Sequence, residues 1–476
     1  KRCLPDAAPG SPDWNVRADT VGAAMRLIGD GLVDREGVTG LAYRLGYSHR
    51  HLARLLTAEI GAPPLALARA KRADTARILL THTGLPASEI AFAAGFSSIR
   101  QFNDTIREVY AMSPTELRAT RRSAETPRGT ITLRLPVRTP FNGTALLAFF
   151  AGRAVTGVET IDGQSYARTL RLPTGSGTVV LTMPDDDSGV SAGGAAGGAA
   201  GYEAGSGTSG GAAGSSAGST HGRTFVTAVL TLDHISDLAP AVARCRRLID
   251  ADADPVGIAA VLGADPALAA AVAEAPGLRL PGAVDGNEIL FRALVGQQVS
   301  VAAARTALGK LTVSADERID SPIPGLTHLF PSAGAIAALG PDGIAGPRRR
   351  AAAIVAAAAD IADGTLTVDA GRRTDDLTAE LVARAGIGPW TAGYVAMRVL
   401  GDPDVLLTGD LAMRNGAAAL MLPSEPRALT AHAERWRPFR SYAGMYLWRS
   451  CPPPVRSKSK SSPTKTTSNR KTKGNQ

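Results

Sequence analysis

Four side chains in this 476-residue chain could act on a flat, positively charged group: Asp410, Trp390, Tyr394 and Trp448. Asp410 follows a short apolar run that ends in glycine, and it opens a new helical segment. An Asp in that position usually caps a helix, but a carboxylate can also stabilise a developing cation or orient water. A cation stacked on an indole is attracted by about 0.5–2 kcal/mol. The alternative is that both tryptophans are ordinary core residues.

A glycine turn, Gly-Ile-Gly-Pro at residues 386–389, lies just before Trp390. It separates two helical patterns and needs the backbone freedom of glycine. The N–H groups that open the next helix are exposed, and they favour a phosphate. Such a hairpin grips a DNA backbone without reading its sequence. The expected DNA-binding hairpin consists of Gly386, Ile387, Gly388 and Thr391.

The hairpin and the aspartate together resemble the motif of the helix-hairpin-helix DNA glycosylase superfamily, (L/A)xGIGxxTA followed by an Asp. Five residues occupy the motif positions: Gly386, Gly388, Thr391, Ala392 and Asp410. The resemblance implies an all-α glycosylase domain in which Asp410 is the catalytic residue. Breaking an N-glycosidic bond builds oxocarbenium character on the sugar, and a carboxylate beneath the sugar stabilises that charge.

Superfamily members that also cleave the DNA strand carry a Lys at the position of Trp390, where it forms a Schiff base. An indole cannot form an imine, so we expect a hydrolase without lyase activity. Trp390, Tyr394 and Trp448 resemble the base pocket of AlkA-type 3-methyladenine DNA glycosylases, as does the run AERWRPFRSYAGMYLW. This implies a DNA-3-methyladenine glycosylase II activity on flipped 3-methyladenine and 7-methylguanine, with no cofactor needed for catalysis. The charge of the lesion, rather than a tight fit, is expected to set selectivity.

A flipped base leaves a hole in the stack that a side chain normally fills. The segment EILFRALVGQQVSVAAARTAL resembles the family's entry motif LGQxVS, in which the residue after the first Gln is the wedge. That residue is usually an apolar Leu, and here it is Gln298. We expect Gln298 as the wedge and Gln297 as its support. The alternative is two surface glutamines at a helix end.

Residues 18–122 contain an internal repeat, LAYRLGYS at 41–48 and IAFAAGFS at 90–97, offset by 49 positions. Each unit has a turn glycine (Gly46, Gly95) and a second helix that begins with a capping Ser (Ser48, Ser97). The pattern resembles the AraC-type tandem helix-turn-helix module that is also found in Ada regulators. The side chains expected in the major groove are Arg50, His51, Arg54, Arg100, Gln101, Asn103 and Arg107. The alternative is a solvated basic surface.

Residues 130–237 change to strand-like alternation with one helical stretch at 143–152, which predicts a small α+β, TBP-like domain. A Gly/Ala/Ser run at 185–223 has almost no bulky residues and is expected to be a disordered insert between two strands. The segment LPVRTPFNGTALLAFFAGRAVTGVE resembles the N-terminal domain of AlkA-type glycosylases. The resemblance implies a scaffold without catalytic residues.

Residues 238–455 read as Ala-rich helices punctuated by Pro and Gly, which suit a two-lobed bundle with Asp410 in the cleft. The expected helices span 238–250, 255–262, 266–275, 288–308, 332–338, 349–363, 378–385, 390–400, 411–419 and 426–435. The fold class is therefore multidomain: an all-α tandem helix-turn-helix, a small α+β domain and an all-α helix-hairpin-helix domain.

Both ends of the chain carry separate signals. KRCLPD at 1–6 resembles the end of the Ada-type zinc domain, so residues 1–17 are interpreted as a remnant and Cys3 as an orphan zinc ligand. Zinc needs four ligands, and it is expected only if a longer protein supplies the missing domain. The tail at 456–476 holds seven basic residues of a chain with net charge +9, leaving +2 elsewhere. It suits non-specific phosphate contact or serves as a spacer.

The sequence shows no 18-residue apolar run and no secretion signal, and its three cysteines suit a reducing compartment. We expect a cytoplasmic protein of the bacterial nucleoid. Its expected partner is double-stranded DNA, both alkylated and promoter DNA, with RNA polymerase as a further partner of the regulator module and no membrane.

Three functions compete at this stage. The leading hypothesis is an alkylpurine glycosylase fused to a sequence-specific regulator of the adaptive response to alkylation. The second is a transcription regulator with an inactive glycosylase domain, and the third is a structural nucleoid protein. The polar linker at 123–128 predicts independent modules, so a chain that begins at Thr130 is expected to fold and excise base alone.

Overall fold

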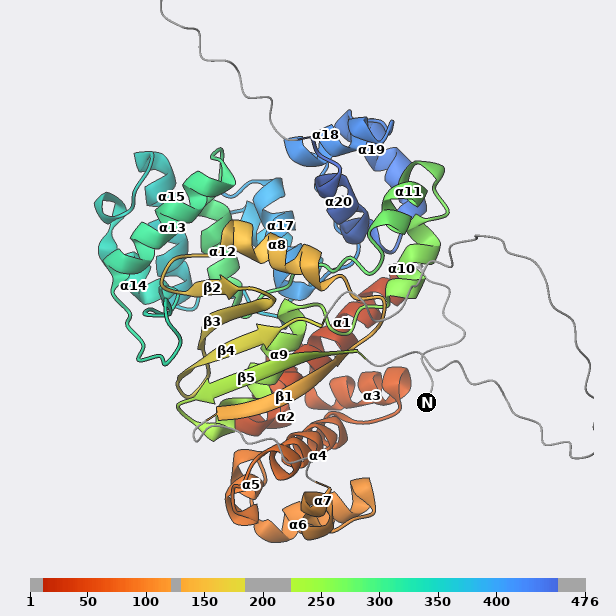
Figure 1. Ribbon diagram of the computed structural model, residues 1–476, viewed down its shortest axis with the longest axis vertical. Helices are drawn as coiled ribbons and strands as arrows, with labels where there is room; N and C mark the ends of the chain where they lie inside the picture. The colour runs from red at the N-terminus through yellow and green to blue at the C-terminus, as the bar shows by residue number, and fades with distance from the viewer. Residues whose placement is uncertain (1–11, 121–129, 185–223, 453–476) are drawn as a thin grey trace, which may run out of the picture.

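The computed structural model describes residues 12–120, 130–184 and 224–452, and for 12–18 only the backbone (Figure 1). Cys3, the linker at 123–128, the insert at 185–223 and the tail at 456–476 lie outside the described residues. In the described part, no helix combines the length and apolar composition that a membrane crossing requires. That same part holds no group of three or more His, Cys or carboxylate side chains suited to a metal ion.

The N-terminal region is entirely helical, and its first helix already crosses the expected boundary at residue 17. Its helices are α1 (Pro12–Gly29), α2 (Leu32–Arg44), α3 (His49–Ile60), α4 (Pro64–His82), α5 (Ala87–Ala93), α6 (Ile99–Tyr110) and α7 (Pro114–Ala119). Gly46 and Gly95 have φ values of +73° and +88°, as the two repeated turns require.

The helix caps of the two repeats differ by one residue. Ser48 accepts a hydrogen bond from the N–H of His51 and caps α3, as expected. The expectation for Ser97 is wrong, because Ser98 accepts from the N–H of Gln101 and caps α6. Ser97 instead donates its hydroxyl to Oε1 of Gln101 at 2.9 Å. The second recognition helix therefore begins one residue later than the repeat predicts.

A five-stranded antiparallel sheet follows, in the order β1-β5-β4-β3-β2. Its strands are β1 (Thr130–Val137), β2 (Glu159–Asp162), β3 (Ser165–Arg171), β4 (Ser176–Thr182) and β5 (Thr224–Leu232), and α8 (Gly143–Arg153) connects β1 to β2. The alternating burial along β1 and β5 gives the sheet a core face. α8 lies between the sheet and the C-terminal helices (Figure 1).

The C-terminal helices form two lobes, each with its own hydrophobic core. They are α9 (Leu238–Leu248), α10 (Pro255–Leu262), α11 (Pro266–Glu274), α12 (Gly286–Val295), α13 (Val301–Ala315), α14 (Ala333–Leu339), α15 (Arg348–Ala362), α16 (Thr374–Val382), α17 (Pro389–Leu400), α18 (Leu411–Ala419), α19 (Pro426–His432) and α20 (Arg440–Arg449). α17 contributes Val395 to one core and Met397 to the other, so it forms the wall between the lobes.

Three helix predictions in this part are wrong. The expected helix at 378–385 runs instead from Thr374 to Val382. The expected helix at 288–308 is two helices, because Gln298 adopts a left-handed φ of +57° and Ser300 caps α13. The expected helix at 426–435 ends at His432 and tightens into a 3-10 turn, Ala433–Trp436. The sequence interpretation also missed α20, because aromatic residues and glycine hide its helical period.

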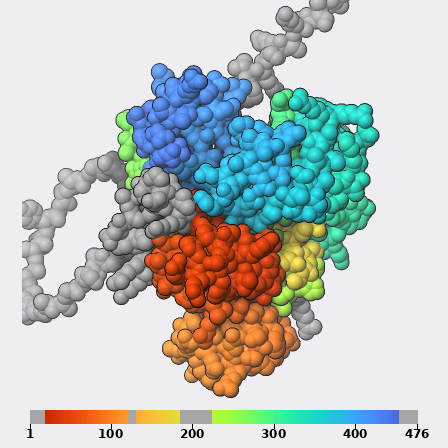
Figure 2. All heavy atoms as spheres, turned by 180° about the vertical axis from the view of Figure 1, so that it is seen from behind, coloured from red at the N-terminus to blue at the C-terminus, as the bar shows by residue number. Residues whose placement is uncertain are grey.

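The modules that were expected to be independent pack against one another. Helix α4 contacts β1, and one hydrophobic cluster contains Leu79 and Ile90 from the N-terminal helices together with Leu133 from the sheet. At the end of α1, Asp30 accepts two hydrogen bonds from Arg247 of α9, at 3.0 and 3.1 Å. In Figure 2 the red N-terminal helices lie directly against the blue C-terminal helices.

Helix α1 also contacts the segment that leads into α16. Arg26 Nε donates to the carbonyl oxygen of Ala370 at 2.6 Å. Leu27 is buried so close to Gly371 that a Cβ on this glycine would lie 2.5 Å from the leucine side chain. Nearby, Arg44 pairs with Asp369 at 3.2 Å. The N-terminal region is therefore part of the support for α16 and α17.

We expect a chain that begins at Thr130 to be less stable than the full chain, because it exposes the shared cluster and leaves Arg247 without Asp30. Its thermal midpoint should fall by several degrees, or it should aggregate. Differential scanning fluorimetry of the two proteins measures this. An unchanged midpoint would show that the two regions are independent after all.

The same interface can be tested without removing residues. Gly371→Ala forces the buried Leu27 to repack and should cost about 1–3 kcal/mol. Gly334→Ala is the matched control, since nothing lies within 4 Å of the added Cβ and the residue is in helix α14. The control should be neutral or slightly stabilising.

Candidate active site

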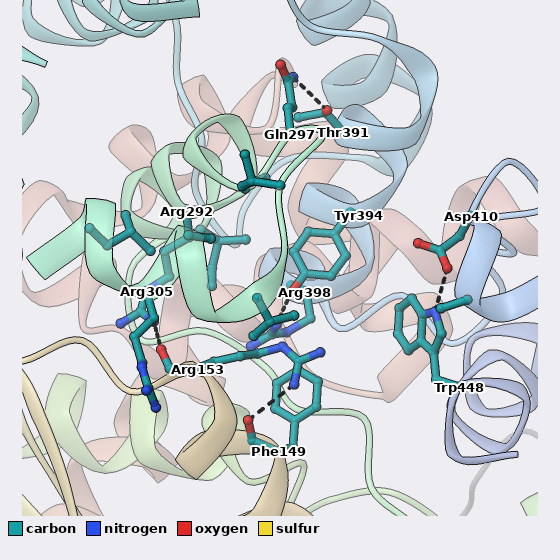
Figure 3. A pocket seen from close by; sticks show the side chains of 18 of the residues that line it. Phe149, Arg153, Arg292, Gln297, Arg305, Thr391, Tyr394, Arg398, Asp410 and Trp448 are labelled. Atoms are coloured by element: carbon teal, nitrogen blue, oxygen red, sulfur yellow. Dashed lines mark hydrogen bonds between the residues drawn. The ribbon is translucent and has the colours of Figure 1, made fainter. Parts of the chain in front are cut away.

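Asp410 is held by three N–H donors from three helices. Its Oδ1 accepts from the backbone N–H of Met413 at 2.8 Å, which caps α18, and from Nε1 of Trp448 at 3.0 Å. Its Oδ2 accepts from Nε1 of Trp390 at 3.0 Å. The residue is thus both the helix cap and the shared acceptor of two indoles from α17 and α20. Figure 3 shows the bond to Trp448 at the edge of the pocket.

Trp390 and Tyr394 form a parallel stack on one side of the pocket. Their ring centroids lie 5.3 Å apart with an interplanar angle of 7°. The spacing of four residues places both rings on the same face of α17. Trp390 and Trp448 are half-buried, so neither is a plain core residue. The three aromatic rings and the carboxylate border one space.

That space is a cavity of about 1180 Å³ between the two helical lobes. It is large enough for a flat aromatic ligand with room to spare. The sequence-predicted residues that line it are Asp410, Trp390, Tyr394, Trp448, Gln297, Gln298, Gly386, Gly388 and Thr391. The structure therefore brings together residues that are more than 150 positions apart in the chain.

The hairpin presents backbone rather than side chains. Gly386 has a φ of +84°, and a Cβ there would lie 2.6 Å from Ala353 of α15, so both space and conformation require glycine. The side chains of Ile387 and Thr391 are buried. Ile387 donates its N–H to the carbonyl oxygen of Arg384 at 3.2 Å. The N–H groups that open α17 have no side-chain cap in the described part of the chain, and such groups bind phosphate.

Gln297 links the expected wedge turn to the hairpin. Its Nε2 donates to the carbonyl oxygen of Gly386 at 3.0 Å and to the hydroxyl of Thr391 at 3.1 Å. Arg350 of α15 donates to the carbonyl oxygen of Gln297 at 2.8 Å. Gln298 is exposed at the tip of the turn. The sequence interpretation assigned no role to the run of arginines at 348–350, and Arg350 now supports this turn.

The sheet domain, expected from the sequence to be a scaffold without catalytic residues, also contributes to the wall of the cavity. Its helix α8 contributes Phe149 and Arg153 to the wall of the cavity, opposite α17. Arg398 of α17 reaches the same place and donates to the hydroxyl of Tyr394 at 2.5 Å. Burial opposes the ionisation of Tyr394, but Arg398 and Arg153 together hold its pKa below the usual value. The spacing of Arg398 from Trp390 and Tyr394 could have revealed it, whereas Arg153 carried no signal.

A buried ion cluster fixes α8 and the sheet to the C-terminal helices. Arg168 of β3 pairs with Glu288 of α12 at 2.6 Å, and Arg292 pairs with Glu159 of β2 at 2.6 Å. The carbonyl oxygen of Arg153 accepts from Arg292 at 3.1 Å. These contacts hold the cavity wall made by α8 against the wall made by α12 and α17.

The expected major-groove residues lie on a separate surface, on α3 and α6. Fully exposed are Arg50, His51, Arg54, Arg100 and Arg107, and half-buried are Gln101 and Asn103. His51 stacks on Tyr47 with centroids 5.0 Å apart, and Gln101 is engaged by Ser97. The arginines are therefore the most available of these side chains.

Comparisons with known proteins agree with this geometry. A helix-turn-helix domain family matches residues 41–120, and the AlkA N-terminal domain family matches residues 132–196 and 207–285. A probable bifunctional transcriptional activator/DNA repair enzyme AlkA of Mycobacterium tuberculosis is 47% identical over 459 residues, which are 96% of this chain and 85% of that protein. The chain belongs to the AlkA family.

Further relatives match parts of this AlkA-family chain. DNA-3-methyladenine glycosylase 2 of Escherichia coli is 30% identical over 316 residues, 65% of this chain and 94% of that protein. The solved structure of a 3-methyladenine DNA glycosylase from Archaeoglobus fulgidus has 17% identity and a TM-score of 0.50, and covers 67% of this chain and 96% of that one. This likeness supports the fold alone. The expected fold class, with its helix-turn-helix, sheet and helix-hairpin-helix parts, is confirmed.

Replacement of Gln297 by Met should loosen the wedge turn from the hairpin, because Met has a similar length but no N–H donor. Two hydrogen bonds of about 0.5–1.5 kcal/mol each are lost. Thermal stability should fall, and binding to duplex DNA should weaken by roughly 5- to 100-fold. Fluorescence can measure both the thermal midpoint of the protein and its binding to a labelled duplex.

Gln298→Met is the control for this change. The residue is adjacent and equally long, but it is exposed and no hydrogen bond of its side chain is found in the described part of the chain. Its thermal midpoint should match that of the wild type. If both variants lost the same stability, Gln297 would not be the link between the two turns.

Proposed function

We propose that this AlkA-family protein hydrolyses the N-glycosidic bond of alkylated purines in duplex DNA, and that its N-terminal module binds promoter DNA as a regulator. The observation that carries the enzymatic half is Asp410, fixed by two indole N–H groups at the edge of an aromatic cavity. A flipped base would enter between the aromatic walls. Its sugar would then lie next to the carboxylate.

The chemistry follows from the electron demand of the reaction. An N3- or N7-alkylated purine is a good leaving group, so the reaction needs little acid assistance. As the bond to the base lengthens, positive charge develops on the sugar, and the oriented carboxylate of Asp410 stabilises it and orients the attacking water. The products are a free base and an abasic site. No metal or organic cofactor takes part in this proposal.

In the same proposal, two turns of the protein hold the DNA. The hairpin at 386–388 binds a phosphate with the N–H groups that open α17, and Gln298 fills the hole left by the flipped base. Gln298 stands at the tip of its turn with a left-handed φ of +57°, a conformation that costs a non-glycine residue energy and is often kept for a function. Its amide can hydrogen-bond the unpaired base on the opposite strand.

The regulator half rests on the exposed arginines of α3 and α6, which suit the edges of guanine in the major groove. The alternative, a regulator with an inactive glycosylase domain, is disfavoured because Asp410, Trp390 and Trp448 are all present and arranged around one cavity. An activator must also contact RNA polymerase, and that contact stays a prediction. Zinc would require ligands besides Cys3.

Incubation of the full chain with methylated duplex DNA should release 3-methyladenine and 7-methylguanine and leave abasic sites in an intact strand. Strand breaks should appear only after alkali treatment, because Trp390 cannot form an imine. Chromatography of the bases and denaturing gels measure both products. Unmethylated DNA is the control.

A covalent enzyme–DNA adduct trapped by borohydride would contradict the hydrolytic mechanism. Absence of any released base, with DNA binding retained, would favour the regulator alternative instead.

A further inference from the structure

Five arginines line the cavity: Arg153, Arg168, Arg292, Arg305 and Arg398. Arg168 pairs with Glu288, and Arg305 is exposed on α13. Arg398 and Arg292 are each held by several protein groups. Arg398 donates to the carbonyl oxygens of Pro281 and Gly282 and to the hydroxyl of Tyr394. Arg292 pairs with Glu159 and Glu288 and donates to a backbone carbonyl. These bonds use most of the five N–H donors of each guanidinium and fix it to the protein.

Arg153 is different. Its side chain donates to the carbonyl oxygen of Phe149 in its own helix, at a long 3.4 Å, and it contacts the Tyr394 hydroxyl. In the described part of the chain it forms no ion pair with a carboxylate. Its guanidinium carbon lies 3.9 Å from the centre of the Phe149 ring, which holds the group in place. Figure 3 shows it beside Tyr394 and Phe149, with Asp410 and Trp448 across the pocket.

The position of Arg153 fixes which part of a base it can meet. If the sugar lies at Asp410, the base extends from there along the Trp390–Tyr394 stack. The purine edge farthest from the glycosidic bond, which carries the substituent on C6, then reaches Arg153. A guanidinium has only N–H donors and no acceptor. It can therefore bind a carbonyl oxygen at that edge. An amino group there is itself a donor, so the two groups cannot form a hydrogen bond.

The positive charge of Arg153 strengthens the preference for a carbonyl oxygen over an amino group. Burial is the main cause that lowers the pKa of Arg153; Tyr394 opposes it, and Arg398 acts in the same direction as burial. A cation at the inner end of the cavity opposes any positively charged base, so the charge selectivity expected from the sequence needs a second interaction beside it. A carbonyl oxygen offsets this repulsion, and an amino group does not.

We infer that Arg153 is a specificity-determining residue that favours damaged bases with a carbonyl oxygen at the edge remote from the sugar, such as 7-alkylguanine, over aminopurines such as 3-alkyladenine. This inference rests on the proposed glycosylase function. It adds the substrate class within that function and assigns the selection to a residue of the sheet domain.

Methylated duplex DNA provides the test, because one digest contains both kinds of base. Under single-turnover conditions, Arg153→Met should lower the release rate of 7-methylguanine relative to 3-methyladenine by about tenfold, the loss expected for a charge-assisted hydrogen bond. Arg153→Lys should restore part of the ratio. Arg318→Met, at an exposed arginine outside the cavity, is the control and should keep the wild-type ratio.

A second substrate separates carbonyl recognition from damage to the fold. A duplex with one hypoxanthine carries the same carbonyl on a neutral base, and its release should fall in Arg153→Met while 3-methyladenine release persists. An unchanged ratio of the two methylated bases would overturn the inference. If the wild-type protein released neither methylated base, the proposed function would be refuted, and the inference with it.

Discussion

The site depends on one constraint: a single carboxylate must satisfy three N–H donors from separate helices. Asp410 caps α18, and the indoles of Trp390 on α17 and Trp448 on α20 donate to its two oxygens. The two indoles and α18 pack on the same hydrophobic core, and α17 also contributes to the core of the other lobe, so Asp410 ties α18 and α20 to the helix that both lobes share. The same bonds orient the aromatic walls and fix the carboxylate in the position that the proposed reaction requires.

The N-terminal and C-terminal halves are one packed structure. Helix α1 lies against Ala370 and Gly371, just before α16, and α16 leads into the hairpin that we propose binds DNA. The sheet domain completes the cavity with α8 and is joined to α12 by buried ion pairs. Breaking one partner of such a pair leaves an uncompensated buried charge. A regulator module seated on the support of the hairpin can therefore influence the enzyme half through ordinary packing.

The sequence allowed much of this to be predicted, where local signals exist. Three local patterns are found again in the structure. They are the Gly386–Gly388 turn, the number of residues between that turn and Asp410, and the repeat at an offset of 49. The contacts of Gln297 with Gly386 and of Leu27 with Gly371 join segments 89 and 344 positions apart, and no periodicity reports such pairs. The sequence analysis did not single out Arg153 for the same reason, because its proposed role depends on α17, which lies across the cavity.

The most direct measurement is the single-turnover rate of base release by Asp410→Asn, compared with Asp265→Asn. Asp265 is a near match outside the cavity: it caps α11 and accepts from the indole of Trp436 at 2.8 Å and from His432 at 2.7 Å. Asp410→Asn should slow release by roughly 10²–10³-fold and keep DNA binding, because the lost charge acts on the transition state. Asp265→Asn should lower stability and keep the rate. Wild-type turnover in Asp410→Asn would contradict the account.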